Sequence, residues 1–110
     1  MKLYSKIYGE RLQDLIIIHG LLGMSDNWNT IGKKFSKYFK VHLIDLRNHG
    51  RSPHSEDFNY DVMCEDVLGY ISDNSINNPI ILGHSLGGKV AMKLAFTYPN
   101  KIEKLIVADI

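Results

Sequence analysis

The chain has 110 residues, which is enough for one small domain. Its hydrophobic content of 45% and its formal net charge of +1 are those of an ordinary globular protein and indicate neither a nucleic-acid partner nor an anionic membrane. Residues 1–15 do not resemble a secretory signal, and no apolar run is long enough to span a membrane. The single cysteine, Cys64, excludes an internal disulfide and fits a reducing, cytoplasmic compartment.

Strands and helices are expected to alternate along the chain. Residues 2–8 alternate between the two faces and predict an antiparallel or edge strand. Short apolar runs predict buried strands at residues 15–18, 41–46, 80–82 and 105–110. Helical spacing of apolar residues predicts amphipathic helices at residues 28–39, 62–71 and 87–98. Asp61 is expected to cap the second of these helices, and Pro99 to stop the third.

This order of elements predicts one α/β domain over residues 1–110, with a mostly parallel sheet and helices on both faces. The strands that end at Ile18 and Leu82 are expected to be neighbours, so that their carboxyl ends flank a switch point where open sheets bind ligands. The last predicted strand reaches Ile110 without a helix after it, and a buried strand left at a sheet edge is unusual. We therefore expect the chain to be the amino-terminal part of a larger domain.

A glycine-rich motif, Gly83-His84-Ser85-Leu86-Gly87, separates the third buried strand from the helix that follows it. A serine at such a strand-to-helix turn is exposed at the end of the sheet, which is the setting of a catalytic nucleophile. The sharp turn brings two chain segments together beneath Ser85, so Gly83 and Gly87 are expected to have no room for a side chain. Ser85 is the predicted nucleophile, and a serine hydroxyl needs a base to accept its proton.

Three segments with this order and spacing resemble the α/β-hydrolase superfamily, namely residues 19–23 (HGLLG), 45–52 (DLRNHGRS) and 83–88 (GHSLGG). They look most like the bacterial serine carboxylesterases and thioesterases of this fold, and the chain matches the amino-terminal portion of such an enzyme. The resemblance implies an oxyanion hole made by the backbone N–H groups of Leu21 and Leu86. It also makes Asp109, at the end of the last strand, a candidate for the acid of the catalytic triad.

The residues around these two loops are expected to form the pocket, namely His19, Gly20, Leu22 and His84, with Met24 and Trp28 at its mouth. His19 and His84 are more easily read as hydrogen-bonded pocket residues than as bases, because neither position directs its ring at Ser85. In this fold the catalytic histidine comes late in the chain, and no histidine follows His84. The general base is thus expected to be absent from these residues.

The other polar residues of note receive structural interpretations. Asp45 and Arg47 are expected to pair and brace their loop, and His42 and His54 are expected at the surface. Cys64 lies within a predicted amphipathic helix and is expected in the core rather than as a reactive thiol. No spacing of histidine, cysteine and acidic residues indicates a metal site, and no cofactor is implied.

The sequence thus favours a serine carboxylesterase that acts on small esters or acyl thioesters through an acyl-enzyme. Two alternatives stay open. The chain could be an inactive fragment, or half of a split enzyme that needs a complementary carboxy-terminal chain docked on its last strand. The same turn also serves acyltransferases and hydrolases of carbon–carbon bonds.

Overall fold

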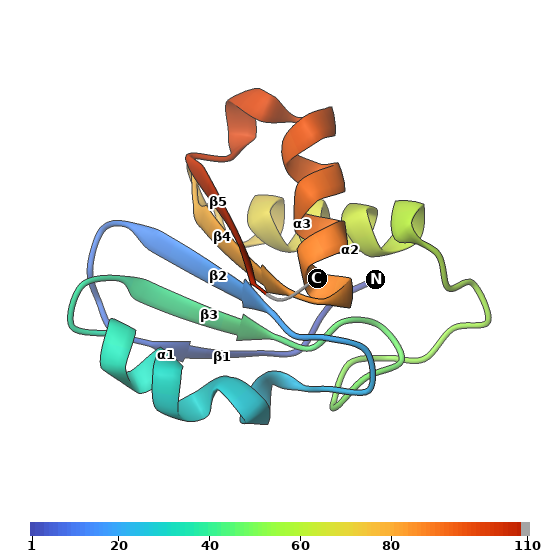
Figure 1. Cartoon of the computed structure of the whole chain (residues 1–110), viewed down its shortest axis with the longest axis horizontal. Coiled ribbons are helices and arrows are strands. Elements are labelled where there is room, and N and C mark those ends of the chain that lie inside the picture. Colours follow the sequence, from blue (N-terminus) through green and yellow to red (C-terminus); the bar gives the residue numbers. More distant parts are fainter. Residues whose placement is uncertain (109–110) are drawn as a thin grey trace.

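A computed structural model of the chain describes residues 1–108, which form one twisted five-stranded sheet flanked by helices (Figure 1). The strands are β1 (Ser5–Tyr8), β2 (Asp14–Ile18), β3 (Lys40–Ile44), β4 (Ile80–His84) and β5 (Lys104–Ala108). Their order across the sheet is β1-β3-β2-β4-β5. Only β1 is antiparallel to its neighbour, and the other strands run parallel. Asp109, the candidate acid, lies outside the described residues.

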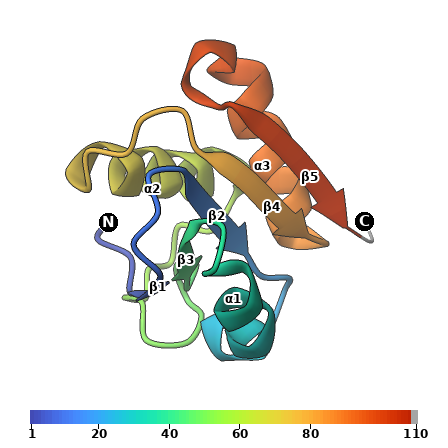
Figure 2. The same cartoon turned by 90° about the vertical axis from the view of Figure 1, so that its left-hand side faces the viewer.

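Helices cover both faces of this sheet, as predicted. The helical elements are a 3-10 turn η1 (Ser25–Trp28), α1 (Asn29–Phe35), α2 (Tyr60–Asp73), α3 (Leu86–Thr97) and a second 3-10 turn η2 (Pro99–Lys101). Figure 2 shows α1 on one side of the sheet, with α2 and α3 together on the other. This arrangement confirms an α/β fold with a mostly parallel sheet.

The central strand β2 is buried on both faces, which explains its continuous apolar run. Ile16 and Ile18 belong to the larger apolar core between the sheet and the α2 and α3 helices. Leu15 and Ile17 point the other way and pack with the side chains beneath α1, including Trp28. Because neighbouring residues of a strand face opposite sides, a strand covered by helices on both sides needs apolar residues at every position.

The pairing of β2 with β4 places the two predicted functional loops side by side. Ile18, the last residue of β2, lies opposite Gly83 in the parallel register. The chain that leaves β2 at His19 therefore emerges next to the chain that leaves β4 at Ser85. This confirms the predicted neighbourhood of the two strands and fixes where a site can form.

Two predicted helix boundaries are wrong. The helix expected over residues 28–39 is an α-helix only from Asn29 to Phe35, preceded by η1. The apolar spacing extended the predicted helix to Phe39 because this residue packs into the same apolar cluster, although it lies just before β3. The cap of α2 is Asn59, whose side-chain oxygen accepts the Val62 N–H at 2.9 Å.

Three predictions about burial and pairing are also wrong. His42 is buried rather than at the surface, because Asp14 and Tyr70 satisfy its two ring nitrogens at 2.7 and 2.8 Å. Arg47 pairs with Asp66 of α2 rather than with Asp45. The last strand, β5, is not buried: Leu105 and Ile106 are 37% and 47% exposed, because β5 has a neighbour on one edge only.

Candidate active site

The Ser85 turn has the strained geometry that the motif predicts. Ser85 joins the last residue of β4 directly to the first residue of α3, with φ of 53° and ψ of −115°. Such a positive φ is disfavoured for any residue with a side chain and persists only where the surroundings enforce it. The Ser85 N–H donates to the Ala108 carbonyl of β5 at 3.2 Å. The Ser85 hydroxyl makes no capping hydrogen bond to α3, a helix that lies wholly within the described residues.

The glycines around Ser85 allow the chain to pass this closely. A Cβ added to Gly83 would lie 2.6 Å from the Gly88 Cα and would overlap the Gly87 backbone. A Cβ added to Gly87 would overlap the backbone carbonyls of Ile18 and His19, at the end of β2. Contacts this short are excluded for real Cβ atoms, so α3 can start against β2 and β4 only with glycine at both positions.

The loop that follows β2 packs against the Ser85 turn. A Cβ on Gly20 would lie 3.3 Å from the Ser85 Cβ and 3.0 Å from His84 Nδ1, so the Gly20 backbone is in close contact with both residues. The next N–H group, that of Leu21, has no hydrogen-bond partner among residues 1–108. Leu86 opens the first turn of α3, whose N–H groups lie at the positive end of the helix.

A second loop, between β3 and α2, holds the first in place. Asp45 accepts hydrogen bonds from the backbone N–H groups of Ser25 at 2.6 Å and Arg51 at 3.0 Å. Gly50 has a φ of 50°, which favours glycine, and a Cβ there would also displace the Asp45 carboxylate from these hydrogen bonds. The Leu22 N–H donates to His49 Nε2 at 3.0 Å. These bonds connect the two loops through side chains that are buried.

A cavity of about 310 Å³ opens beside the Ser85 turn. Its walls come from the Gly20 loop, from η1 and α1, and from the end of β4, namely Gly20, Leu21, Gly23, Asn27, Trp28, Ile31 and His84. The rings of Trp28 and His84 meet edge to face, with centroids 5.8 Å apart. The walls combine apolar side chains with a few polar groups, a combination that is common in small-molecule sites.

The predicted pocket residues occupy different places. Gly20 and His84 line the cavity, and Leu22 lies outside it with its side chain 90% exposed. His19 is 1% exposed and lies behind the loop, where burial lowers the pKa of its ring. Met24 does not line the cavity. Asn27 and Ile31 do, and sequence reasoning missed both; the spacing of Ile31 three residues after Trp28 was a signal for it.

Three of the five histidines have both ring nitrogens occupied by other groups. His19 contacts the Gly20 carbonyl and the Leu46 N–H, at 2.7 and 3.0 Å. His49 contacts the Arg47 carbonyl and the Leu22 N–H, at 2.9 and 3.0 Å. His42 is held by Asp14 and Tyr70 far from the Ser85 turn, since its strand position lies in the middle of β3. A ring engaged in this way has no free lone pair to accept a proton from Ser85.

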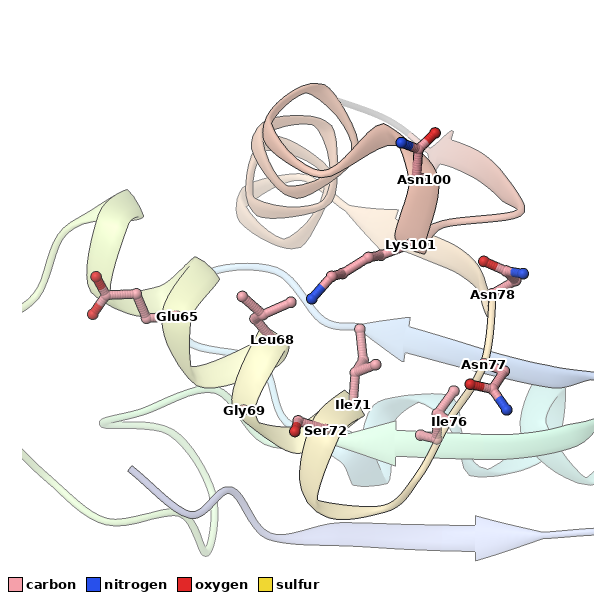
Figure 3. A pocket seen from close by; sticks show the side chains of 10 residues that line it. All are labelled: Glu65, Leu68, Gly69, Ile71, Ser72, Ile76, Asn77, Asn78, Asn100 and Lys101. Atoms are coloured by element: carbon pink, nitrogen blue, oxygen red, sulfur yellow. The ribbon is translucent and has the colours of Figure 1, made fainter.

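A larger cavity, of about 580 Å³, lies at the opposite end of the sheet (Figure 3). Its walls come from α2, from the segment before β4 and from η2; in Figure 3 the Lys101 side chain extends across it toward α2. Ser85 follows the carboxyl end of β4, whereas Asn77 and Asn78 precede its amino end. This cavity is therefore separate from the chemistry of the Ser85 turn.

None of the helices within residues 1–108 is both long and apolar enough to cross a membrane. No three side chains among the described histidines, cysteines and acidic residues are grouped so that they could hold a metal ion.

Comparison with known proteins agrees with the motifs. Residues 15–110 match the family model described as "alpha/beta hydrolase fold". A Haemophilus influenzae protein named "Putative esterase/lipase" is 50% identical over 86% of this chain and 33% of its own length. A Saccharomyces cerevisiae protein named "Probable alcohol acetyltransferase" is 46% identical over 92% of this chain and 31% of its own length. The chain spans about a third of the length of these relatives.

Solved structures show the same similarity. The structure titled "Marine microorganism esterase" superposes with a TM-score of 0.98 and 48% identity, over 99% of this chain and 42% of that one. The match thus includes the Ser85 turn, the Gly20 loop and every strand of the described sheet. With the family model covering nearly the whole sequence, the chain belongs to the α/β-hydrolase family.

Proposed function

We propose that this chain supplies the nucleophile and the oxyanion-binding backbone of a serine hydrolase that acts on carboxylic esters or acyl thioesters. The observation that carries the proposal is the Ser85 turn, which is held at positive φ between β4 and α3 with the Gly20 loop packed against it. A strained turn of this kind is kept where it serves a function. In this proposal the Ser85 hydroxyl lies between the Gly20 loop and the first turn of α3, each of which offers a backbone N–H group.

The chemistry follows from these groups. The Ser85 Oγ attacks the carbonyl carbon of the ester, and its proton passes to a general base. The carbonyl oxygen becomes an oxyanion, which accepts hydrogen bonds from the Leu21 and Leu86 N–H groups; losing one such donor typically costs about 10²–10³-fold in kcat. Collapse of this intermediate breaks the bond to the alcohol or thiol, which leaves with the proton. Water then attacks the acyl-serine by the same steps in reverse and releases the acid.

His19, His42 and His49 are poor candidates for the base, because both ring nitrogens of each are engaged. We propose that a histidine outside residues 1–110 supplies it, from a later segment of the same protein or from a complementary chain. Asp109, which lies outside the described residues, is proposed as the acid that orients this histidine. The exposed apolar residues of the edge strand β5, Leu105 and Ile106, support a further strand or chain packed there.

The cavity beside Ser85 suggests the kind of group that binds. Leu21, Trp28 and Ile31 give it an apolar wall, and its volume of about 310 Å³ is small. A short apolar acyl or alkyl group fits such a wall better than a charged one. The names of the relatives, an esterase/lipase and an "sn-1-specific diacylglycerol lipase ABHD11" of Danio rerio that is 43% identical, are consistent with ester substrates.

A second candidate function is acyl transfer to an alcohol. It is favoured by the yeast relative named as an alcohol acetyltransferase, whose similarity to this chain is close to that of the esterase/lipase. The two functions share the acyl-serine and differ only in whether water or an alcohol attacks it. Supplying ethanol or butanol together with an acyl ester, and measuring the ratio of new ester to free acid, separates them.

The test of the nucleophile is labelling by a fluorophosphonate followed by intact-mass measurement. Two proteins are compared: residues 1–110, and the same residues extended by whatever the gene encodes after Ile110. We expect rapid labelling of the extended protein, slow labelling of the shorter one, and none in either after Ser85→Ala. Ser72→Ala, at an exposed position of α2, is the matched control and should label like the parent.

Two results would overturn this proposal. The first is rapid labelling that survives Ser85→Ala, because the nucleophile is then another residue. The second is an extended protein that carries a histidine after residue 110 and still neither labels nor hydrolyses p-nitrophenyl acetate. That result would favour the inactive-fragment interpretation. Rapid labelling of residues 1–110 alone would contradict the proposed external base but not the nucleophile.

A further inference from the structure

Two histidine rings lie together behind the Gly20 loop. His19 comes directly after β2, and His49 comes from the loop that follows β3. The side chains are buried, at 1% and 7% exposure, and their ring centroids are 4.9 Å apart. Neither histidine lines the cavity beside Ser85. Their contacts instead lead to the two peptide bonds on either side of Leu21.

His19 holds the peptide bond that precedes Leu21. Its Nδ1 lies 2.7 Å from the Gly20 carbonyl oxygen, which also accepts the Gly23 N–H at 3.0 Å. The Gly20–Leu21 peptide is trans, as are all those described, and it is planar. The Leu21 N–H therefore points opposite to the Gly20 carbonyl. His19 and the Gly23 N–H hold the Gly20 carbonyl inside the loop. They thereby also hold the Leu21 N–H so that it points out of the loop.

His49 holds the peptide bond that follows Leu21. Its Nε2 accepts the Leu22 N–H at 3.0 Å. Leu22 has a φ of 63°, which is disfavoured for a leucine and has to be enforced by its surroundings. Leu22 is 90% exposed, so packing of its side chain does not enforce it. Two hydrogen bonds hold this backbone instead, that of the Leu22 N–H to His49 Nε2 and that of the Gly23 N–H to the Gly20 carbonyl across the turn.

The partners of the two rings determine where each ring carries its proton. A carbonyl only accepts hydrogen bonds and a backbone N–H only donates. His19 must donate from Nδ1 to Gly20 and accept at Nε2 from the Leu46 N–H. His49 must donate from Nδ1 to Arg47 and accept at Nε2 from Leu22. Each ring thus donates from Nδ1 and accepts at Nε2, since a proton on either Nε2 would place two donors face to face.

We propose that His19 and His49 are positioning residues that together fix the direction of the Leu21 N–H. The contacts stand by themselves, and the purpose assigned to them rests on the proposed function, in which this N–H binds the oxyanion. The two rings form a brace between the loops after β2 and β3. Neither ring touches the substrate, and each acts through one peptide bond next to Leu21.

The brace can be tested without any enzymatic activity. In the uniformly ¹⁵N-labelled chain of residues 1–110, long-range ¹H–¹⁵N spectra report the tautomer of each histidine. We expect the Nδ1–H form for His19 and His49, and hydrogen exchange at the Leu22 amide at least about 10-fold slower than at the Leu21 amide, because only the former is bonded. An Nε2–H tautomer at either ring, or a Leu22 amide that exchanges as fast as that of Leu21, would overturn the brace.

Kinetics on the extended protein test its purpose. His49→Phe keeps a flat ring but offers no acceptor to Leu22, whereas His49→Gln places an oxygen near the position of Nε2. We expect His49→Phe to lower kcat by about 10- to 10²-fold with KM nearly unchanged, because an oxyanion donor acts in the transition state. His49→Gln should recover most of this loss. His54→Phe, at an exposed loop position, is the matched control and should leave both constants unchanged.

The two failures are distinguishable. If Ser85→Ala leaves hydrolysis intact, the proposed function fails while the tautomer and exchange results still test the brace. If Ser85→Ala abolishes hydrolysis but His49→Phe changes kcat less than 3-fold, the positioning role is wrong. A change confined to KM would also contradict it. Circular dichroism shows whether His49→Phe folds. If it does not, kcat of His49→Gln relative to the parent decides. A loss in kcat above about 10²-fold would then overturn the expected rescue.

Discussion

Arg47 donates two hydrogen bonds to the carboxylate of Asp66, from Nε to Oδ2 at 2.6 Å and from Nη2 to Oδ1 at 2.9 Å. The Arg47 side chain is 9% exposed and that of Asp66 is 2% exposed, so the pair is almost sealed from water. It ties the loop after β3 to the α2 helix, and Arg47 also donates to the Asp57 carbonyl at 2.9 Å. The loop that carries His49 is therefore fixed to α2 through the Arg47–Asp66 pair.

Removing one partner of this pair should destabilise the fold strongly. Asp66→Ala leaves the Arg47 charge buried without a counter-charge, and breaking buried pairs in this way costs about 3 kcal/mol or more. Urea unfolding followed by circular dichroism measures the change. The matched control is Asp61→Ala, because Asp61 forms an exposed pair with Lys93 at 2.9 Å and its loss should change the unfolding midpoint far less. Equal midpoints for the two variants would contradict the prediction.

The strain at Ser85 has a measurable signature. Glycine tolerates φ of 53°, whereas alanine does not, so Ser85→Gly should be more stable than Ser85→Ala by about 1 kcal/mol, even though glycine loosens the unfolded chain. At Glu65, in the exposed middle of α2, the order should reverse, because glycine is about 1 kcal/mol worse than alanine inside a helix. Finding alanine favoured at both positions would rule out the strained geometry.

Cys64 should be unreactive until the chain unfolds. Its side chain is 6% exposed, its thiol contacts the Val90 carbonyl at 3.4 Å, and burial raises the thiol pKa to about 11. From an ordinary value of 9.0, this lowers the thiolate fraction at pH 8 by about 10²-fold. Ellman's reagent should therefore react at least about 10²-fold more slowly without urea than in denaturing urea. The chain has one cysteine, so any rapid native reaction would contradict this directly.

Stability should fall as the pH drops below about 6.5. Burial lowers the pKa of His42 below its ordinary value of 6.5, against the opposing effect of Asp14; Lys40 adds to the lowering, and Tyr70 is the other ring partner. The unfolded chain then binds more protons than the folded one, so stability present above pH 6.5 is lost as the pH falls toward the folded pKa.

Urea midpoints measured between pH 7.5 and 5.5 test this expectation. His42→Gln should flatten the decline, and some slope should persist because the pKa of buried His19 is lowered as well. His54→Gln, at an exposed position with no buried contact, should decline like the parent. A parent chain that becomes more stable on acidification would show that the sign is wrong.

Local patterns in the sequence predicted much of this molecule, and the reason is local chemistry. The apolar run of residues 15–18 indicated a strand covered on both faces, and Gly83 and Gly87 indicated a turn too tight for side chains. The serine at that turn and the neighbouring loop of residues 19–23 were recognisable because glycine, histidine and serine at those spacings are typical of a nucleophile turn and are uncommon in other structures. Each of these features depends on residues close together in the chain.

Only the tertiary structure decided which distant polar groups meet. His42 looked like a surface residue and is buried, because Asp14 and Tyr70 come to it from β2 and α2. Arg47 pairs with Asp66 from α2 rather than with nearby Asp45.

By itself, the sequence determined the fold class and the position of Ser85, since spacing along the chain dictates both. The contact of His49 with the Leu22 N–H joins residues 27 apart in the chain. Periodicity carries no information about such a contact, because a hydrogen bond is made only when folding brings a donor and an acceptor within about 3 Å.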